Sequence, residues 1–230
     1  MSKDRVEAVE RAILVLGAFS EEESSLSLKR LSEKTGLYKS TILRIVGTLE
    51  YHGYIIKGVK GEYHLGSTLW KLGCVYKNSF DSEAFIRPIL AGIRDTINET
   101  VAFYIKSADR RICLYRENAK REVCHNLSEG LDLPLDQGAG GRVLSAFSGA
   151  EGGLYESIRE QGWYWSKGER NPDVAAIAVP VLTPSGELKG ALSISALIFR
   201  LNDKMVEEFV PLLKVEAERA GRGLEGSPIM

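Results

Sequence analysis

Four residues that could contact nucleic acid lie close together in the first quarter of the sequence: Lys39, Ser40, Thr41 and Arg44. Ammonium, guanidinium and hydroxyl groups donate hydrogen bonds to phosphate oxygens and to the edges of bases. The four side chains would act together only if one element of structure presented them on a common exposed face.

A helix from about Lys39 to Tyr51 would provide this face. Its apolar residues recur at i, i+3, i+4 and i+7, which predicts a buried side. These residues are Ile42, Ile45, Val46 and Leu49. The basic and hydroxyl residues named above fall on the opposite side of a helical wheel or in the first turn, together with Gly47. The exposed face therefore carries donors and little bulk, as a helix in the major groove of DNA requires.

Two more helices are predicted before this one. From Val6 to Phe19 apolar residues recur every three or four positions, which marks an amphipathic helix. A shorter helix runs from Leu28 to Lys34, where Ser27 provides the N-cap and Gly36 ends the helix. The second and third helices, with the turn between them, form a helix-turn-helix at about residues 27–47.

A two-stranded hairpin is predicted after the third helix. The strands Tyr54–Lys57 and Glu62–Leu65 flank a turn at Gly58–Gly61, whose glycines suit positive φ angles. Lys57 and Lys60 lie in this wing and are available to a phosphate backbone. The whole pattern predicts a winged helix-turn-helix DNA-binding domain in residues 1–66, with the wing at about residues 54–65.

Charge is distributed unevenly, although the chain as a whole carries a net charge of -1. Residues 27–60 contain seven basic and two acidic residues, a local excess of five positive charges. Such an excess neutralises DNA phosphates. Two other interpretations stay open: a winged helix that contacts proteins, and a small helical domain with a solvated basic side.

The composition is that of a folded protein, with 44% hydrophobic and 27% charged residues. A length of 230 residues suits two domains. The N-terminus is too charged for a signal peptide, and no apolar run approaches the roughly 20 residues that span a bilayer. We therefore expect a cytoplasmic location without membrane contact. Cys74, Cys113 and Cys124 have no CxxC spacing, so neither a disulfide framework, a metal site nor a cofactor is expected.

Residues suited to catalysis are not grouped in the sequence. There is no GxSxG or HExxH motif, and His52, His64 and His125 are scattered. Cys124 and His125 adjoin on a presumed strand and would point to opposite faces, which prevents a nucleophile–base pair. The sequence therefore predicts that the protein is not an enzyme.

Five short motifs of the N-terminal region stand out: Arg11–Leu16 (RAILVL), Lys39–Arg44 (KSTILR), Thr48–Glu50, Gly53–Tyr54 and Tyr63–Gly66. They resemble those of the IclR family of bacterial transcriptional regulators. The resemblance covers nearly the whole chain. It implies an N-terminal DNA-binding domain, a C-terminal effector-binding domain with a GAF-like fold, and homodimers or homotetramers on double-stranded operator DNA. A ligand-responsive repressor or activator of a catabolic operon is expected.

A linker helix is predicted in residues 67–79. Leu69, Leu72 and Tyr76 form one apolar stripe, and Trp70 and Val75 lie beside it. Because an exposed apolar stripe needs a partner, self-association through this helix is expected. Packing of the stripe on the chain's own C-terminal domain is the alternative.

Residues 80–230 predict an α+β domain with a mainly antiparallel sheet flanked by helices. Strand patterns occur at 101–105, 111–116, 177–182 and 191–196. The short turns at 107–110 and 183–187 indicate antiparallel hairpins. Helices are expected at 82–98, 141–147, 150–161 and 202–224.

Small and hydroxyl residues suggest where an effector would bind. The run Gly138, Ala139, Gly140 and Gly141 precedes a predicted helix, and small residues let an anion approach the N–H groups of a helix N-terminus. A tight loop packed on the sheet explains the same run equally well. Ser193 and Ser195 alternate on a strand, so their hydroxyls face one side and could bond a ligand or neighbouring backbone. The family resemblance implies that these positions line the effector pocket.

Two positions depart from the glyoxylate-type sensors of the family, which have an acidic residue at the place of Ser166 and a cysteine near Ala176. Both substitutions remove a polar anchor. The aromatic run Trp163–Trp165 adds apolar surface nearby, so an aromatic acid suits the pocket as well as a small keto acid does. The run could also be core or interface. The alternative function is a DNA-binding regulator whose C-terminal domain only oligomerises and senses no ligand.

Overall fold

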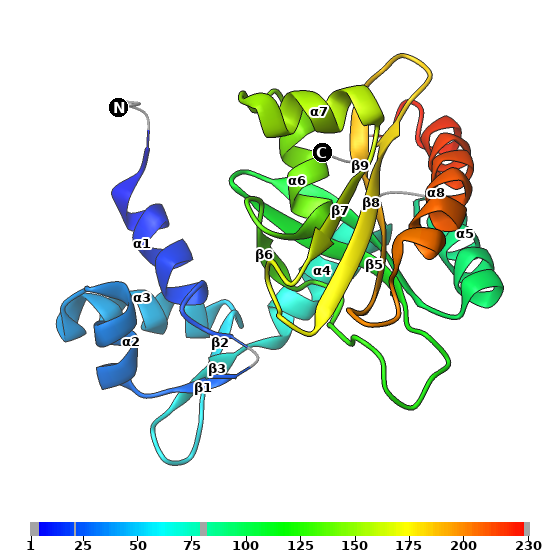
Figure 1. The fold of residues 1–230 in the computed structure, drawn as a ribbon. Helices are drawn as coiled ribbons and strands as arrows, with labels where there is room; N and C mark the ends of the chain where they lie inside the picture. The colour runs from blue at the N-terminus through cyan, green and yellow to red at the C-terminus, as the bar shows by residue number, and fades with distance from the viewer. Residues whose placement is uncertain (1–4, 21, 79–81, 228–230) are drawn as a thin grey trace. The chain divides into compact units, whose positions relative to one another are not determined.

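The computed structural model describes residues 5–20, 22–78 and 82–227. The chain divides into two compact units, residues 1–79 and 80–230 (Figure 1). The predicted boundary between the linker helix and the C-terminal domain, at residues 79 and 80, lies outside the described residues. Within those residues, we find no helix with both the length and the apolar character needed to cross a membrane.

The N-terminal unit is a small helical domain with a three-stranded sheet. Its helices are α1 (Glu7–Leu16), α2 (Leu28–Thr35), α3 (Lys39–Tyr51) and α4 (Ser67–Asn78). Its strands are β1 (Ser25–Leu26), β2 (Ile55–Lys57) and β3 (Tyr63–Leu65), which pair antiparallel in the order β1-β3-β2. The predicted wing is present. The sequence did not predict β1, because a strand of two residues has no periodic pattern.

Local capping explains the helix-turn-helix. The Ser27 hydroxyl accepts a hydrogen bond from the Arg30 N–H at 3.2 Å, which confirms Ser27 as the N-cap of α2. Gly36 ends α2 with a φ of +71°, a conformation that glycine adopts without strain. In α3, Ile42 and Val46 are fully buried, so the predicted bounds and core side of this helix are confirmed.

Two details of this unit differ from the prediction. The first helix is shorter than expected, and Val6, Val9 and Ile13 are each more than half exposed, because only Val15 of α1 is buried in the core. The apolar stripe of α1 therefore faces outward. In the wing turn Gly61 has a φ of +85°, whereas Gly58 is not in the positive-φ region.

The C-terminal unit contains a six-stranded sheet in the order β6-β5-β4-β9-β8-β7, and all of its neighbouring strands are antiparallel. The strands are β4 (Thr100–Ser107), β5 (Arg110–Glu117), β6 (Asp132–Pro134), β7 (Tyr164–Lys167), β8 (Val174–Leu182) and β9 (Leu188–Leu197). Both predicted hairpins are present, as β4–β5 and β8–β9. The edge strands β6 and β7 were missed, since both are short.

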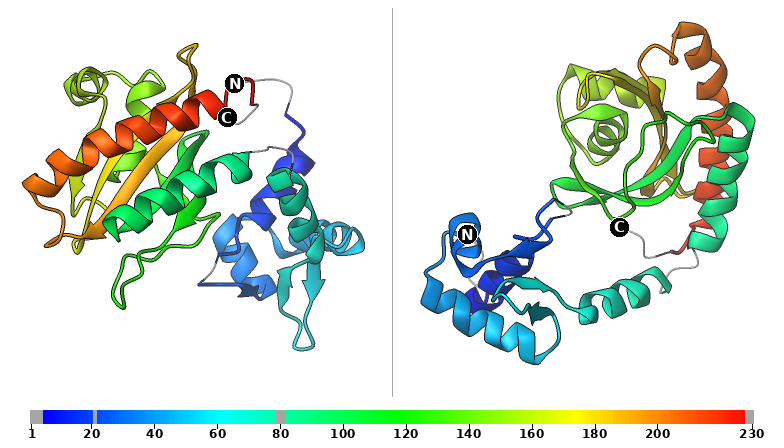
Figure 2. Two further views of the ribbon diagram at one scale, coloured as in Figure 1. Left: turned by 90° about the vertical axis from the view of Figure 1, so that its right-hand side faces the viewer. Right: turned by 90° about the horizontal axis from the view of Figure 1, so that it is seen from below.

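Helices cover both faces of this sheet. They are α5 (Ser82–Ile97), α6 (Gly138–Phe147), α7 (Gly153–Gln161) and α8 (Asp203–Gly223). α5 and α8 lie side by side on one face, and α6 and α7 lie on the other (Figures 1 and 2). Each face has its own apolar core, centred on residues such as Leu90 and Leu213 on the first face and Val143 and Leu144 on the second. The α+β fold class is confirmed.

Three expectations about this unit are corrected. α6 begins at Gly138, so Gly138–Gly141 is the first turn of the helix and not a loop before it. Cys124 and His125 lie in a segment without a strand, so alternation does not decide where their side chains point. Trp163 and Trp165 pack against the core under α5 and α8, and only Tyr164 packs on the α6 side. The two tryptophans are therefore half-buried residues that pack on this core.

Candidate nucleic-acid interface and ligand pocket

The first turns of α3 present the predicted DNA-contacting residues. Lys39, Ser40 and Arg44 are exposed, and Thr41 is half-buried. The turn that orients α3 is fixed by side chains of α2. The Ser32 hydroxyl donates to the Leu37 carbonyl at 2.7 Å, and the Thr35 hydroxyl accepts from the Leu37 N–H at 3.3 Å. Hydrogen bonds across the turn thus hold α3 at a defined angle to α2.

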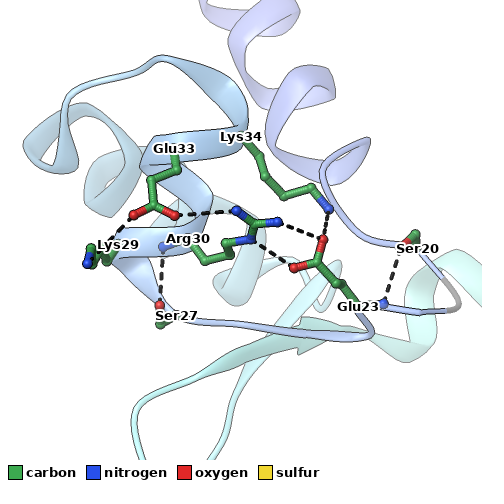
Figure 3. Close-up of polar contacts among 7 residues, drawn as sticks. All are labelled: Ser20, Glu23, Ser27, Lys29, Arg30, Glu33 and Lys34. Atoms are coloured by element: carbon green, nitrogen blue, oxygen red, sulfur yellow. Dashed lines mark hydrogen bonds and ion pairs between the residues drawn. The ribbon is translucent and has the colours of Figure 1, made fainter.

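A carboxylate outside residues 27–60 neutralises part of the positive charge of that segment (Figure 3). Glu23 binds Arg30 at 2.8 Å and Lys34 at 2.6 Å, and these two cations lower the pKa of the Glu23 carboxyl to about 2. Glu33 also pairs with Arg30, at 3.4 Å, and with Lys29, at 3.8 Å. The three basic residues of α2 are thus already paired with carboxylates.

The other basic residues of this segment are the ones that were predicted to contact DNA. Lys39, Arg44, Lys57 and Lys60 form no ion pair with any residue that the structure describes. The Lys57 ammonium lies 5.9 Å from the centre of the Tyr63 ring. Pairing within α2 therefore leaves the cations of α3 and the wing for an external partner.

Acid unfolding tests the Glu23 network. The folded-state pKa of Glu23 is depressed from 4.5 to about 2, so its contribution to stability is present above pH 4.5 and is lost as the pH falls through about 2. We expect Glu23→Gln to unfold at lower denaturant concentration than the wild type at pH 7, with the difference shrinking between pH 4.5 and pH 2. Glu22→Gln is the control. A difference that is constant over this range would contradict the network.

The C-terminal unit contains a cavity of about 40 Å³ beside the first turn of α6. Seven of the eight predicted effector-binding residues line it: Gly138, Ala139, Gly140, Ser166, Ala176, Ser193 and Ser195. Gly141 does not line the cavity, because its backbone lies against the Leu135 carbonyl and the Arg111 side chain. For Gly141 the lack of a side chain is therefore explained by close packing and not by contact with a ligand.

Ser166 occupies one N–H group of the α6 N-terminus. Its hydroxyl oxygen accepts from the Ala139 N–H at 3.0 Å, and the side chain is buried. A neutral hydroxyl thus caps the helix where the glyoxylate-type sensors are expected to carry an acid. Ala176 faces Ser166 across the β7–β8 pair and adds only a methyl group to the cavity wall.

His125 is a cavity residue that the sequence did not suggest. Its Nε2 lies 2.8 Å from Arg170 Nη2, and its Nδ1 lies 3.1 Å from the Ser195 hydroxyl oxygen. A guanidinium only donates, so Nε2 accepts and Nδ1–H donates to Ser195. Burial, together with the nearby Arg116 and Arg170, lowers the pKa of His125 to about 4. The imidazole is therefore neutral at pH 7.

Arg111 brings a buried positive charge to the same cavity. Its side chain is only 4% exposed, and Nη1 donates to the Gln137 carbonyl at 2.7 Å. The guanidinium lies 5.2 Å from the centre of the Tyr104 ring. Burial lowers the pKa of Arg111. Its Nε is buried and has no hydrogen-bond partner among the described residues. A buried N–H without a partner is costly unless a ligand or water completes it.

Glu169 provides the negative charge of the cavity. Its Oε2 accepts from the Gly138 N–H at 2.9 Å and from Arg142 Nε at 3.3 Å. Its Oε1 accepts from the Tyr164 hydroxyl at 2.8 Å. Burial and this hydrogen bond raise the pKa of Tyr164 to about 12. The cavity thus combines the guanidiniums of Arg111 and Arg170 with one internal carboxylate.

Sequence reasoning missed eight of the fifteen lining residues: Tyr104, Arg111, His125, Leu127, Glu169, Arg170, Asn171 and Val174. A signal existed for Arg111, because it shares the inward side of β5 with Cys113, and a cation at such a position needs a polar partner. His125, Glu169 and Arg170 lie outside regular elements, where periodicity gives no direction. In the described part of the chain, no three His, Cys, Asp or Glu side chains form a group that could hold a metal ion.

Comparison with known proteins identifies the family. The model of the IclR helix-turn-helix domain matches residues 8–57, and the model of the bacterial transcriptional regulator IclR C-terminal domain matches residues 154–221. The chain therefore belongs to the IclR family of DNA-binding transcriptional regulators, and not to a family of enzymes. The predicted resemblance is confirmed.

Individual relatives align with nearly the whole chain. The HTH-type transcriptional regulator XynR of Escherichia coli is 26% identical, over 95% of this chain and 96% of its own length. A putative IclR transcriptional regulator from Silicibacter has a TM-score of 0.82 at 19% identity and covers 93% of this chain and 96% of its own. An IclR homologue from Microbacterium hydrocarbonoxydans, solved with 4-hydroxybenzoate, has a TM-score of 0.77 at 19% identity and covers 96% of this chain and 100% of its own.

Proposed function

We propose that this regulator responds to a small organic acid that binds in the cavity beside α6. The observation that carries the proposal is the buried Arg111 guanidinium, whose Nε–H has no partner in the described residues and which faces a cavity at a helix N-terminus. Both groups favour an anion. The 4-hydroxybenzoate bound to the Microbacterium homologue supports a carboxylate as the recognised group.

The size of the effector is less constrained than its charge. A cavity of about 40 Å³ has room for a few water molecules and not for a whole organic acid, so the binding of an effector requires local opening. Because Trp163 and Trp165 pack in the opposite core, they give no argument for an aromatic ligand. The class that we propose is therefore a carboxylic acid, aromatic or aliphatic, of the kind that a catabolic operon would process.

A panel of small carboxylic acids in a thermal-shift assay tests this proposal. An effector at 100 times its dissociation constant is expected to stabilise the protein by about 2.7 kcal/mol. Amides of the same acids serve as controls, since they lack the charge that Arg111 would bind. If no acid stabilises the protein more than its amide does, the alternative of a C-terminal unit that only oligomerises is favoured.

We further propose that α3 enters the major groove of operator DNA. In this arrangement Lys39, Ser40, Thr41 and Arg44 contact bases and phosphates, and Lys57 and Lys60 of the wing contact the backbone. All of these residues are exposed except the half-buried Thr41, and the four cations form no ion pair in the described residues, which supports these roles. Operator binding requires access to the chromosome, so a cytoplasmic location follows from this proposal.

Self-association is proposed because a helix-turn-helix monomer contacts only one half-site of a palindromic operator. On α4, Trp70 is 78% exposed and Leu72 is 46% exposed, which supports this helix as a contact in a homodimer or a dimer of dimers.

Leu72→Glu is expected to shift the protein from dimer toward monomer at micromolar concentration, because the interface would have to desolvate a carboxylate. Sedimentation velocity measures the change. Lys71→Glu, which alters charge on the same turn without removing an apolar side chain, is the control. A wild type that is already monomeric, or a dimer unaffected by Leu72→Glu, would refute α4 as the contact.

A further inference from the structure

Two N–H groups of the α6 N-terminus are already occupied by side chains of the protein itself. The first N–H groups of a helix have no partner within the helix, and the helix dipole favours negative charge there. The Gly138 N–H donates to the Glu169 carboxylate at 2.9 Å, and the Ala139 N–H donates to the Ser166 hydroxyl at 3.0 Å. An external carboxylate would use these same donors.

Glu169 is held as a bound carboxylate would be. Besides the Gly138 N–H, its two oxygens accept from the Arg142 guanidinium at 3.3 Å and from the Tyr164 hydroxyl at 2.8 Å. The side chain is 21% exposed and lines the cavity. Three kinds of donor, a backbone N–H, a guanidinium and a phenol, thus converge on one internal anion.

Arg111 shows independently that the cavity is prepared for a further acceptor. Its guanidinium is buried against the same helix turn, where Nη1 donates to the Gln137 carbonyl at 2.7 Å. Its Nε has no partner in the described residues. The Glu169 carboxylate therefore accepts from the helix N-terminus, and none of its hydrogen bonds within the described part of the chain comes from the buried Arg111 guanidinium.

We propose that Glu169 is an internal ligand of the pocket, which the carboxylate of an effector replaces at the N-terminus of α6. The inference rests on the proposed function of the cavity as an effector site. Displacement is required because an effector carboxylate at this position would need the Gly138 N–H that Glu169 already uses, and because two like charges repel strongly in a buried site. Glu169 then sets the effector concentration to which the regulator responds.

Chemical rescue tests the internal-ligand role without the natural effector. Glu169→Ala empties the position, so sodium propionate is expected to raise its melting temperature in a saturable way, by about 3–6 °C at ten times the dissociation constant. Propionamide at the same ionic strength should give no rise, and neither should propionate added to the wild type. Glu129→Ala is the matched control, because Glu129 also accepts from a backbone N–H, of Arg116, and from an arginine, Arg87, but lies outside the cavity.

A second measurement uses Glu169→Gln, which keeps the shape of the side chain and removes its charge. We expect this variant to bind 4-hydroxybenzoate about tenfold more tightly than the wild type by titration calorimetry, a change of about 1.4 kcal/mol. Equal or weaker binding by Glu169→Gln, or propionate rescue that is absent in Glu169→Ala or equal in Glu129→Ala, overturns the proposal. If propionate rescues Glu169→Ala but neither the wild type nor Glu169→Gln binds any acid of the panel, the role of Glu169 as an internal ligand is supported and the proposed effector function is not.

Discussion

Replacing Arg44 by alanine is expected to weaken specific operator binding by about 1–3 kcal/mol. Arg44 lies on the exposed side of α3, opposite the buried Ile42 and Val46, and forms no ion pair within the described residues. A guanidinium in this position can donate two hydrogen bonds to one guanine, so its loss should relax specificity at a single base pair. Fluorescence anisotropy with operator and scrambled DNA measures both effects.

Two control variants separate recognition from general attraction. Arg30→Ala removes an arginine that already pairs with Glu23 and Glu33, so operator affinity should change by no more than about twofold. Lys60→Ala, in the wing, should weaken binding to all DNA sequences alike. It should also lower the slope of log affinity against log salt concentration by about one, the value for one lost phosphate contact. Full operator affinity in both Arg44→Ala and Ser40→Ala at physiological salt would rule out α3 as the recognition helix.

Ser193→Val is expected to abolish the effector response while operator affinity without effector stays within a few-fold of the wild type. Ser193 is buried on β9, and its hydroxyl lines the small cavity, so an added methyl group fills space that an acid would need. The response lost should equal the full coupling between the sites, typically about 1–3 kcal/mol, or about 5- to 150-fold in operator affinity.

Ser107→Val serves as the control for this variant. Ser107 is an exposed serine at the end of β4, outside the cavity, so valine suits its strand conformation and touches no ligand. Operator titrations with and without a stabilising acid decide the question. A normal response in Ser193→Val would show that the acid binds elsewhere.

The elements with strong periodicity could be predicted from the sequence. The bounds of α3 and the Ser27 cap were correct because the apolar spacing and the hydroxyl at the cap act locally. Which side of α1 is buried could not be predicted. Its apolar residues Val6, Val9 and Ile13 have the same spacing as those of α3 but remain exposed in the N-terminal unit. Amphipathicity gives the period of a helix and not the partner of its apolar side.

The candidate pocket was predictable in its small residues and not in its charges. The small residues at a helix start and the alternating serines have a local signal, and five of these positions line the cavity, whereas Ser166 and Ala176 were selected through the family resemblance. The charged residues Arg111, Glu169 and Arg170 reach the cavity only because the β5–β4–β9–β8–β7 order brings distant segments together. The Glu23 network was likewise missed, because Glu23 lies outside the basic segment that it neutralises.

Reciprocal titration of the wild-type protein tests the central claim, that acid binding in the C-terminal unit controls operator affinity. Operator dissociation constants are measured with and without saturating acid, and acid dissociation constants with and without saturating operator. Thermodynamic linkage requires both ratios to be the same factor. We predict one common factor between about 5 and 150. A ratio of one in both titrations, with an acid that demonstrably binds, would contradict the account.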